Sequence, residues 1–139
     1  MERLSLKECL FCGVQNTSPE YNRPPDKEIL MENKLAYAIR DGFPVTSMHT
    51  LIIPKRHLRD YFELQNDELV SCSELIHSLR DEMIKLDSSI TGFNIGINNG
   101  ESSGQTIFHC HIHLIPRRDG DVPNPRGGVR HIIPGKGDY

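Results

Sequence analysis

Apolar residues recur at spacings of three and four over about 20 positions in the middle of the chain, a pattern typical of an amphipathic helix. The helix is expected to begin near Asn66, because Asn66-Asp-Glu68 provides a capping residue followed by acidic side chains at the positive end of the helix dipole. Cys72 is expected to fill the core and His77 to lie at the helix surface. The apolar stripe consists of Leu69, Cys72, Ile76, Leu79, Met83 and Leu86.

Shorter apolar segments alternate or run together as β-strands do. We expect strands over residues 29–32, 35–39, 50–53, 93–98 and 106–115, with Phe93, Ile95 and Ile97 facing inward. Residues 17–28 contain three prolines and are expected to form a loop. Several strands with one long helix inserted predict an α+β fold, in which the helix packs on an antiparallel sheet of about five strands.

Length and composition narrow the class of protein. The chain has 139 residues, a mass of 15.8 kDa and a formal charge of -3, which predicts a single domain over residues 1–139 with a core that needs no disulfides. The acidic balance argues against a partner of duplex nucleic acid. No apolar run approaches the roughly 18 to 20 residues that cross a bilayer, and the charged N-terminus does not resemble a signal peptide. We therefore expect a cytoplasmic protein with reduced cysteines and no membrane contact.

The charge is unevenly distributed along the sequence. Residues 116–139 hold five basic and three acidic side chains, a balance of +2, which leaves -5 for residues 1–115. This segment is rich in Gly, Pro and Arg and is expected to be an irregular tail. Such a tail could be solvated, or it could close over an anionic ligand with Arg126 and Arg130 as candidate phosphate contacts.

Three histidines stand at alternate positions, His109, His111 and His113. Side chains on a strand alternate between faces, so these three are expected to project from one side of the sheet, about 6.6 to 6.8 Å apart, while the residues between them face the core. Imidazoles in such a row cost stability unless ligands or hydrogen-bond partners satisfy their ring nitrogens. The pattern therefore favours a functional site.

The segment from Gly104 to Arg117 resembles the signature of the histidine triad (HIT) family, His-x-His-x-His followed by two apolar residues. The segment from Met48 to His57 resembles that family's second hallmark, and Cys9-Leu-Phe-Cys12 matches its zinc-carrying, bacterial-type branch. The resemblance covers residues 9–117 and implies the HIT-like fold, with similarity to diadenosine polyphosphate hydrolases and nucleotide phosphoramidases. Met48 and Ser47 depart from the family, which commonly has Gly and Pro there.

By this resemblance the protein is a nucleotide hydrolase or nucleotidyl transferase that acts at the α-phosphate of AMP-linked substrates such as diadenosine tetraphosphate. His111 resembles the nucleophile that forms a transient nucleotidyl-histidine, a role that suits a neutral imidazole with a free lone pair at pH 7. His113 resembles the histidine that contacts the phosphate. Further substrate contacts are implied for Asp41, at the ribose, and for Asn98, Gln105 and Thr106, at the phosphate or the leaving group.

Cys9 and Cys12 alone could be a redox pair or part of a turn without a chemical role, because one Cys-x-x-Cys supplies only two of the four ligands of a tetrahedral zinc site. The resemblance supplies two further ligands, His49 and His109, and so implies a structural zinc. Two thiolates and two imidazoles suit zinc in a reducing compartment. His57 is expected to be structural or at the surface, without chemistry. No organic cofactor is expected.

Other interpretations stay open at this stage. A catalytic zinc bound by all three alternating histidines is disfavoured, because the outer two would lie roughly 13 Å apart along a strand. A phosphoramidase or phosphorylase of the same family, or a nucleotide-binding protein without turnover, would share the same motifs. The resemblance also implies a homodimer.

Overall fold

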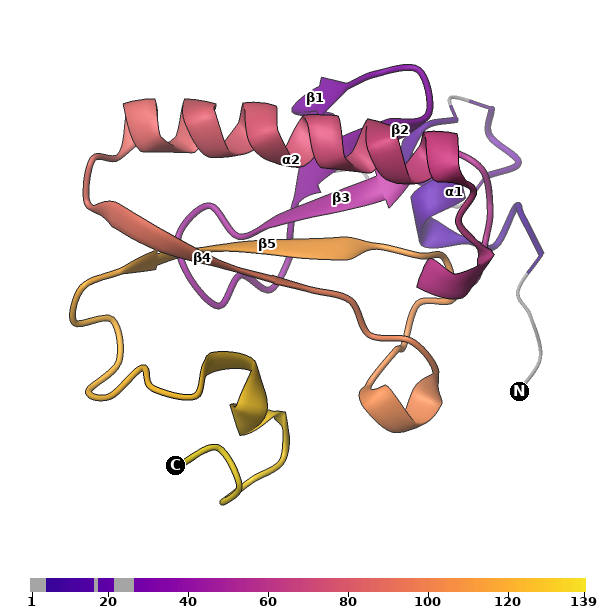
Figure 1. Ribbon diagram of the computed structural model, residues 1–139. Coiled ribbons are helices and arrows are strands. Elements are labelled where there is room, and N and C mark those ends of the chain that lie inside the picture. Colours follow the sequence, from indigo (N-terminus) through magenta and orange to yellow (C-terminus); the bar gives the residue numbers. More distant parts are fainter. Residues whose placement is uncertain (1–4, 17, 22–26) are drawn as a thin grey trace.

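The computed structural model describes residues 5–16, 18–21 and 27–139 (Figure 1). A five-stranded antiparallel sheet in the order β1-β2-β3-β5-β4 lies under one long helix, α2, so the predicted α+β fold with an antiparallel sheet is confirmed. Of the predicted loop over residues 17–28, residues 17 and 22–26 lie outside the described part. The elements are α1 Leu10–Val14, β1 Met31–Glu32, β2 Ala36–Arg40, β3 Thr50–Pro54, η1 Tyr61–Glu63, α2 Asn66–Leu86, β4 Ile90–Gly96, η2 Glu101–Ser103, β5 Ile112–Arg118 and η3 Gly128–Ile132.

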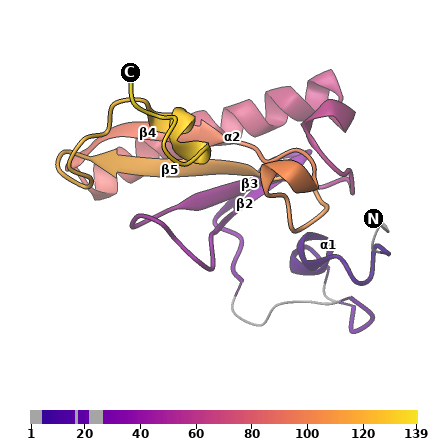
Figure 2. The same ribbon diagram turned by 90° about the horizontal axis from the view of Figure 1, so that it is seen from below.

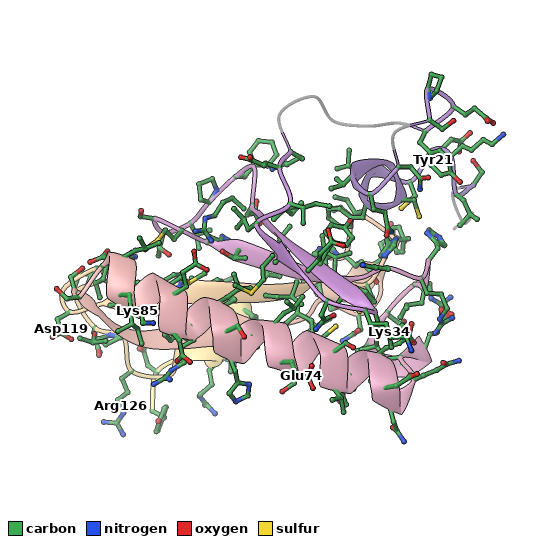
Figure 3. All side chains as sticks on the ribbon, turned by 90° about the horizontal axis from the view of Figure 1, so that it is seen from above. Tyr21, Lys34, Glu74, Lys85, Asp119 and Arg126 are labelled. Atoms are coloured by element: carbon green, nitrogen blue, oxygen red, sulfur yellow. The ribbon has the colours of Figure 1, made fainter. Side chains whose placement is uncertain are left out.

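Helix α2 begins at the predicted residue and crosses the sheet (Figure 1). At its start, the Gln65 backbone N–H donates to the Glu68 side chain at 2.9 Å, and the buried Glu68 carboxylate also pairs with Arg56 at 2.8 Å. Glu74 and Lys85 lie on the solvent-exposed surface of the helix (Figure 3). No helix of the described residues is long and apolar enough to cross a membrane.

Two apolar clusters occupy opposite faces of the sheet. The first packs α2 against the sheet, and its helical members differ from the predicted stripe at both ends, because Leu69 and Leu86 are exposed while Leu75 is buried. The second packs the short α1 against the other face. The first cluster includes Ala38, Ile52, Cys72, Leu75, Leu79, Met83, Ile112 and Leu114, and the second Phe11, Val14, Tyr37, Ile39, Leu51 and Ile53.

Strand β5 begins later than the sequence pattern indicated. Residues 106–111 were expected to be strand, but β5 runs from Ile112 to Arg118. The segment before it leaves the sheet because the Cys110 N–H donates to the Leu58 carbonyl oxygen at 2.8 Å instead of to β3. His109 and His111 therefore lie in the segment before β5, and only His113 lies in the strand.

The edge strand differs from the expectation in one respect. Ile95 of β4 was expected to face inward, but it is 52% exposed because β4 is the edge strand. The tail after Arg118 contains only the short η3, and it runs along the side of the sheet opposite α2 (Figures 1 and 2). A pair of hydrogen bonds from Arg117 to Asp121, both 2.8 Å long, holds the turn that sends the tail back along the sheet.

Candidate metal centre and active site

Two thiols and two imidazoles meet where α1 approaches the ends of β3 and of the segment before β5. The Cys9 Sγ lies 3.4 Å and the Cys12 Sγ 3.6 Å from Nδ1 of His109, and the Cys12 Sγ lies 3.3 Å from Nδ1 of His57. The four ligand atoms all lie within 4.8 Å of one another. Tetrahedral zinc, with bonds of about 2.3 Å to sulfur and 2.0 to 2.1 Å to nitrogen, separates its ligand atoms by about 3.6 Å. The donor set and its spacing therefore fit one zinc ion.

The protonation of His109 agrees with this role. Its Nε2 lies 2.7 Å from the carbonyl oxygen of Pro54, which can only accept, so Nε2 carries the proton and Nδ1 turns a lone pair toward the thiols. Burial lowers the pKa of His109 to about 4 and, together with Cys9, raises the pKa of Cys12 to about 12. A bound cation would reverse the second shift, since metal-bound thiols ionise.

The cluster differs from the predicted ligand set in one member. His57, to which no chemistry was assigned, completes the cluster, whereas His49 does not reach it. The two histidines flank β3 at opposite ends, and a strand of five residues spans roughly 17 Å. His57 follows the end of β3 that faces α1, whereas His49 precedes the end next to Asp41.

His111 lies between the thiol–imidazole cluster and β5, and a backbone carbonyl sets the tautomer of its ring. Its Nδ1 lies 2.8 Å from the carbonyl oxygen of His109, so Nδ1–H donates and Nε2 keeps its lone pair. The ring packs edge to face on Phe11 with centroids 5.0 Å apart. Burial lowers the pKa of His111, which keeps the imidazole neutral at pH 7.

His113, Asp41 and His49 form a second group beside His111. The His113 ring centroid is 5.4 Å from that of His111, and burial, followed by the nearby His111, lowers the His113 pKa to about 4. Asp41, directly after β2, accepts a hydrogen bond from the Phe43 N–H at 2.7 Å through Oδ1, while Oδ2 lies 3.4 Å from Nε2 of His49. A ribose contact for Asp41 stays a prediction.

The other expected phosphate contacts, Asn98, Gln105 and Thr106, lie in the loop that carries η2 and differ in their exposure to solvent. Gln105 is buried, and its amide is used within the protein, accepting from the Gly100 N–H at 2.8 Å and donating to the Arg59 carbonyl oxygen at 2.6 Å. Gln105 thus holds the loop in shape and does not offer its side chain to a ligand. Asn98 and Thr106 are exposed and accessible to one.

The loop before β3 has an unusual backbone. Met48, at the position where the histidine triad family commonly has Gly, adopts a left-handed φ of 69°. This turn lets the His49 carbonyl oxygen accept from the Asp41 N–H at 2.9 Å and directs the His49 ring toward His113. The departure from glycine therefore leaves the turn intact, at the cost of about 1 kcal/mol of strain that a non-glycine residue bears there.

A pocket of about 730 Å³ opens beside His113, between β4, β5, the loop before β3 and the tail. Its arginines are already paired, since Arg117 binds Asp121 and Arg118 binds Asp87 at 3.0 Å. The two tail arginines, Arg126 and Arg130, lie over the Tyr139 ring at 4.4 and 4.9 Å. The residues that line the pocket include His49, Asn98 and His113 with the apolar Val45, Ile95, Ile115 and Val129.

This fold and site define a histidine triad domain with a Cys2His2 cluster at its N-terminal side. The HIT domain model matches residues 22–120, and the chain belongs to the HIT family. An uncharacterized HIT-like protein of Mycoplasma genitalium is 34% identical over 118 residues, 84% of this chain and 78% of that protein.

Two relatives carry the name of an activity. The adenosine 5'-monophosphoramidase HNT1 of Candida albicans is 31% identical over 120 residues, 83% of this chain and 74% of that protein. The adenylylsulfatase HINT3 of Arabidopsis thaliana is 32% identical over 115 residues, 82% of this chain and 54% of that protein.

Solved structures agree on the fold. A HIT family protein from Bacillus anthracis superposes with a TM-score of 0.64 at 35% identity, covering 68% of this chain and 67% of the other. A Zn-bound histidine triad family protein from Mycobacterium smegmatis superposes with a TM-score of 0.62 at 32% identity, covering 67% of each chain. The second structure shows that a relative with this fold binds zinc.

Proposed function

We propose that the protein hydrolyses AMP-linked substrates at the α-phosphate, dinucleoside polyphosphates among them, through a nucleotidyl intermediate on His111. The observation that carries the proposal is the hydrogen bond from His111 Nδ1–H to the His109 carbonyl oxygen, which leaves Nε2 with a free lone pair in a neutral ring. A nucleophile needs that state at neutral pH. The names of the phosphoramidase and adenylylsulfatase relatives support an AMP-linked substrate.

The residues around His111 can divide the reaction into two displacements. Nε2 of His111 attacks phosphorus while the bond to the leaving group breaks, and the leaving atom departs with the electron pair and takes up a proton. Water then attacks phosphorus, the P–N bond breaks with its electrons returning to Nε2, and the proton of the water passes to solvent. Glycines at positive φ, Gly100 and Gly104, let the backbone of the η2 loop come close to an anion.

A structural zinc is part of this proposal. Cys9, Cys12, His57 and His109 would hold it, and its chemistry would be to fix these four side chains in one arrangement. Because the His109 carbonyl oxygen orients the nucleophile, a fixed His109 also fixes Nε2 of His111. The metal centre therefore supports the active site without contacting the phosphate.

A second candidate, a phosphoramidase that releases an amine, is favoured by the pocket beside His113. A polyphosphate leaving group would need free cations there, yet Arg117 and Arg118 are already paired with carboxylates and the remaining lining is largely apolar. An amine or another small, weakly charged leaving group fits this pocket better than a chain of phosphates.

One substrate panel tests both candidates. Diadenosine tetraphosphate, adenosine phosphoramidate and adenylyl sulfate are assayed with and without inorganic phosphate, since hydrolysis yields AMP and phosphorolysis yields ADP. We expect AMP from at least one substrate, and none from the His111→Ala variant. His77→Ala, a histidine exposed on α2, is the matched control and should retain the wild-type rate. Equal turnover by His111→Ala and wild type would refute the assignment of His111 as the nucleophile.

The proposal includes a homodimer in the cytoplasm. Among the described residues β4 is an edge strand, and its free edge together with the exposed Ile95 offers a surface that a second copy could cover. The four cysteines are free, as expected in a reducing compartment. Light scattering on the purified protein measures the mass, and a monomer at micromolar concentration would contradict the dimer.

A further inference from the structure

Asp41, His49 and His113 form a compact group next to the proposed nucleophile. Nε2 of His49 lies 2.9 Å from Nδ1 of His113, and Oδ2 of Asp41 lies 3.4 Å from the first nitrogen and 3.8 Å from the second. Two imidazoles and a carboxylate at this spacing could hold a divalent cation, as in other sites with two His and one carboxylate. They could equally form a chain of hydrogen bonds.

The backbone of Val45 decides between these two possibilities. Its N–H donates to Nδ1 of His49 at 3.1 Å, and a backbone amide can only donate, so Nδ1 must present its lone pair. His49 is 3% exposed, and burial lowers its pKa, so the ring is neutral and its single proton is on Nε2. A nitrogen that carries a proton cannot bind a metal. The group is therefore a chain of hydrogen bonds.

The same proton determines the state of His113. The short contact between His49 Nε2 and His113 Nδ1 holds one proton, and it belongs to His49, so Nδ1 of His113 accepts. A neutral His113 then carries its proton on Nε2. The Asp41 carboxylate is farther from both nitrogens and reinforces the Nε2–H of His49.

We propose that His49 is a positioning residue that fixes the tautomer of His113, so that His113 offers an Nε2–H donor to the substrate. Adjacent rings with centroids 5.4 Å apart then have opposite states, a bare Nε2 on His111 to attack phosphorus and a protonated Nε2 on His113 to bond a phosphate or leaving-group oxygen. The two backbone groups that impose these states, the His109 carbonyl and the Val45 amide, come from different segments. The substrate side of this inference rests on the proposed function, whereas the tautomer does not.

The tautomer can be measured without substrate. Long-range proton–nitrogen NMR of full-length protein labelled with ¹⁵N-histidine reports which ring nitrogen of His113 is protonated. We expect the proton on Nε2 in wild type and in His49→Gln, because an amide can accept from Val45 and donate to His113. In His49→Leu the donor is lost, and we expect the proton to move to Nδ1, toward Asp41. A wild-type His113 protonated on Nδ1, or on both nitrogens, would overturn the proposal.

Kinetics test the consequence on whichever substrate of the panel is turned over. His49→Leu should lower kcat by about 10²- to 10⁴-fold, the usual contribution of a placed proton donor, with a smaller change in KM, and His49→Gln should restore much of the loss. In a His113→Ala background, His49→Leu should have no further effect on kcat. An undiminished kcat in His49→Leu, or a full additional loss in the double variant, would contradict the proposal. Failure of the wild type on every substrate would count against the proposed function alone, since the NMR result stands apart from it.

A misfolded variant is recognised by its metal and its stability. His49→Leu should keep the zinc content and the thermal midpoint of His49→Gln, because neither change touches the Cys9, Cys12, His57 and His109 cluster. If His49→Leu unfolds, the comparison of wild type with His49→Gln by NMR still decides the tautomer of His113.

Discussion

Replacing His57 with alanine should remove the metal, whereas replacing His49 should not. A structural zinc in a small domain contributes about 10 to 16 kcal/mol of binding free energy at pH 7. Divided evenly over Cys9, Cys12, His57 and His109, this is about 2.5 to 4 kcal/mol for each ligand, which corresponds to zinc binding weakened roughly 10²- to 10³-fold.

Metal analysis of the purified variants measures this directly. We expect one zinc per chain in wild type and in His49→Ala, and well below one in His57→Ala after dialysis against a weak chelator. Because zinc binds the folded chain, the thermal midpoint of His57→Ala should also fall, and raising it again should need a zinc concentration roughly 10²- to 10³-fold higher than in wild type. If His57→Ala kept a full zinc equivalent and His49→Ala lost it, the fourth ligand would be His49, as the sequence had predicted, and the assignment of His57 would be refuted.

A chelator separates a structural from a catalytic metal. A catalytic zinc would leave quickly, with activity lost and the fold intact. The buried Cys9, Cys12 and His109 instead predict slow loss of activity that accompanies unfolding. Fast inactivation without a change in circular dichroism would place the metal at the reaction centre.

Three further predictions concern stability. The pKa of His113 is lowered to about 4 in the folded chain, against about 6.5 in the unfolded chain. Between these pH values the unfolded state binds more protons, so acid destabilises the folded protein. Chemical denaturation at pH 7 and pH 5 should therefore show that the free energy of unfolding falls by about 1 kcal/mol less in His113→Gln than in wild type. Leu79→Ala, on the buried face of α2, should lower the free energy of unfolding by about 2 to 5 kcal/mol, and a decrease of less than 1 kcal/mol would contradict its packing in the core. Gln105→Ala should lower the free energy of unfolding by about 1 to 3 kcal/mol, because the Gly100 N–H and the Arg59 carbonyl oxygen lose their hydrogen-bond partner. An unchanged denaturation midpoint would show that the loop does not depend on the Gln105 side chain.

The sequence predicted those features that depend on neighbours along the chain. The 3- and 4-residue spacing located α2, and alternation placed Ile112 and Leu114 in the core. The late start of β5 was missed because a β-branched, aromatic stretch has strand propensity whether or not a partner strand is available. Here the Leu58 carbonyl takes the N–H of Cys110 and draws the chain away from the sheet.

The candidate metal centre depends on contacts between residues that are far apart in the sequence. Two histidines, His49 and His57, flank the same strand, and the motif alone does not say which end of that strand faces α1. His57 follows shortly after Pro54, and the carbonyl oxygen of Pro54 also orients His109, a contact that the structure shows and the sequence does not. Likewise, the tautomers of His111 and His113 depend on backbone groups far away in sequence or in an adjacent loop, which no motif encodes.

The proposed mechanism requires that His111 becomes covalently nucleotidylated. Mixing the protein with an AMP-linked substrate from the panel, quenching within milliseconds to seconds and digesting the chain under mildly alkaline conditions allows mass spectrometry to locate any adenylate. We expect AMP attached to the peptide that carries His111, absent in His111→Ala and present at lower occupancy in His49→Leu. Adenylate on another residue, or turnover with no adduct at any quench time, would contradict it.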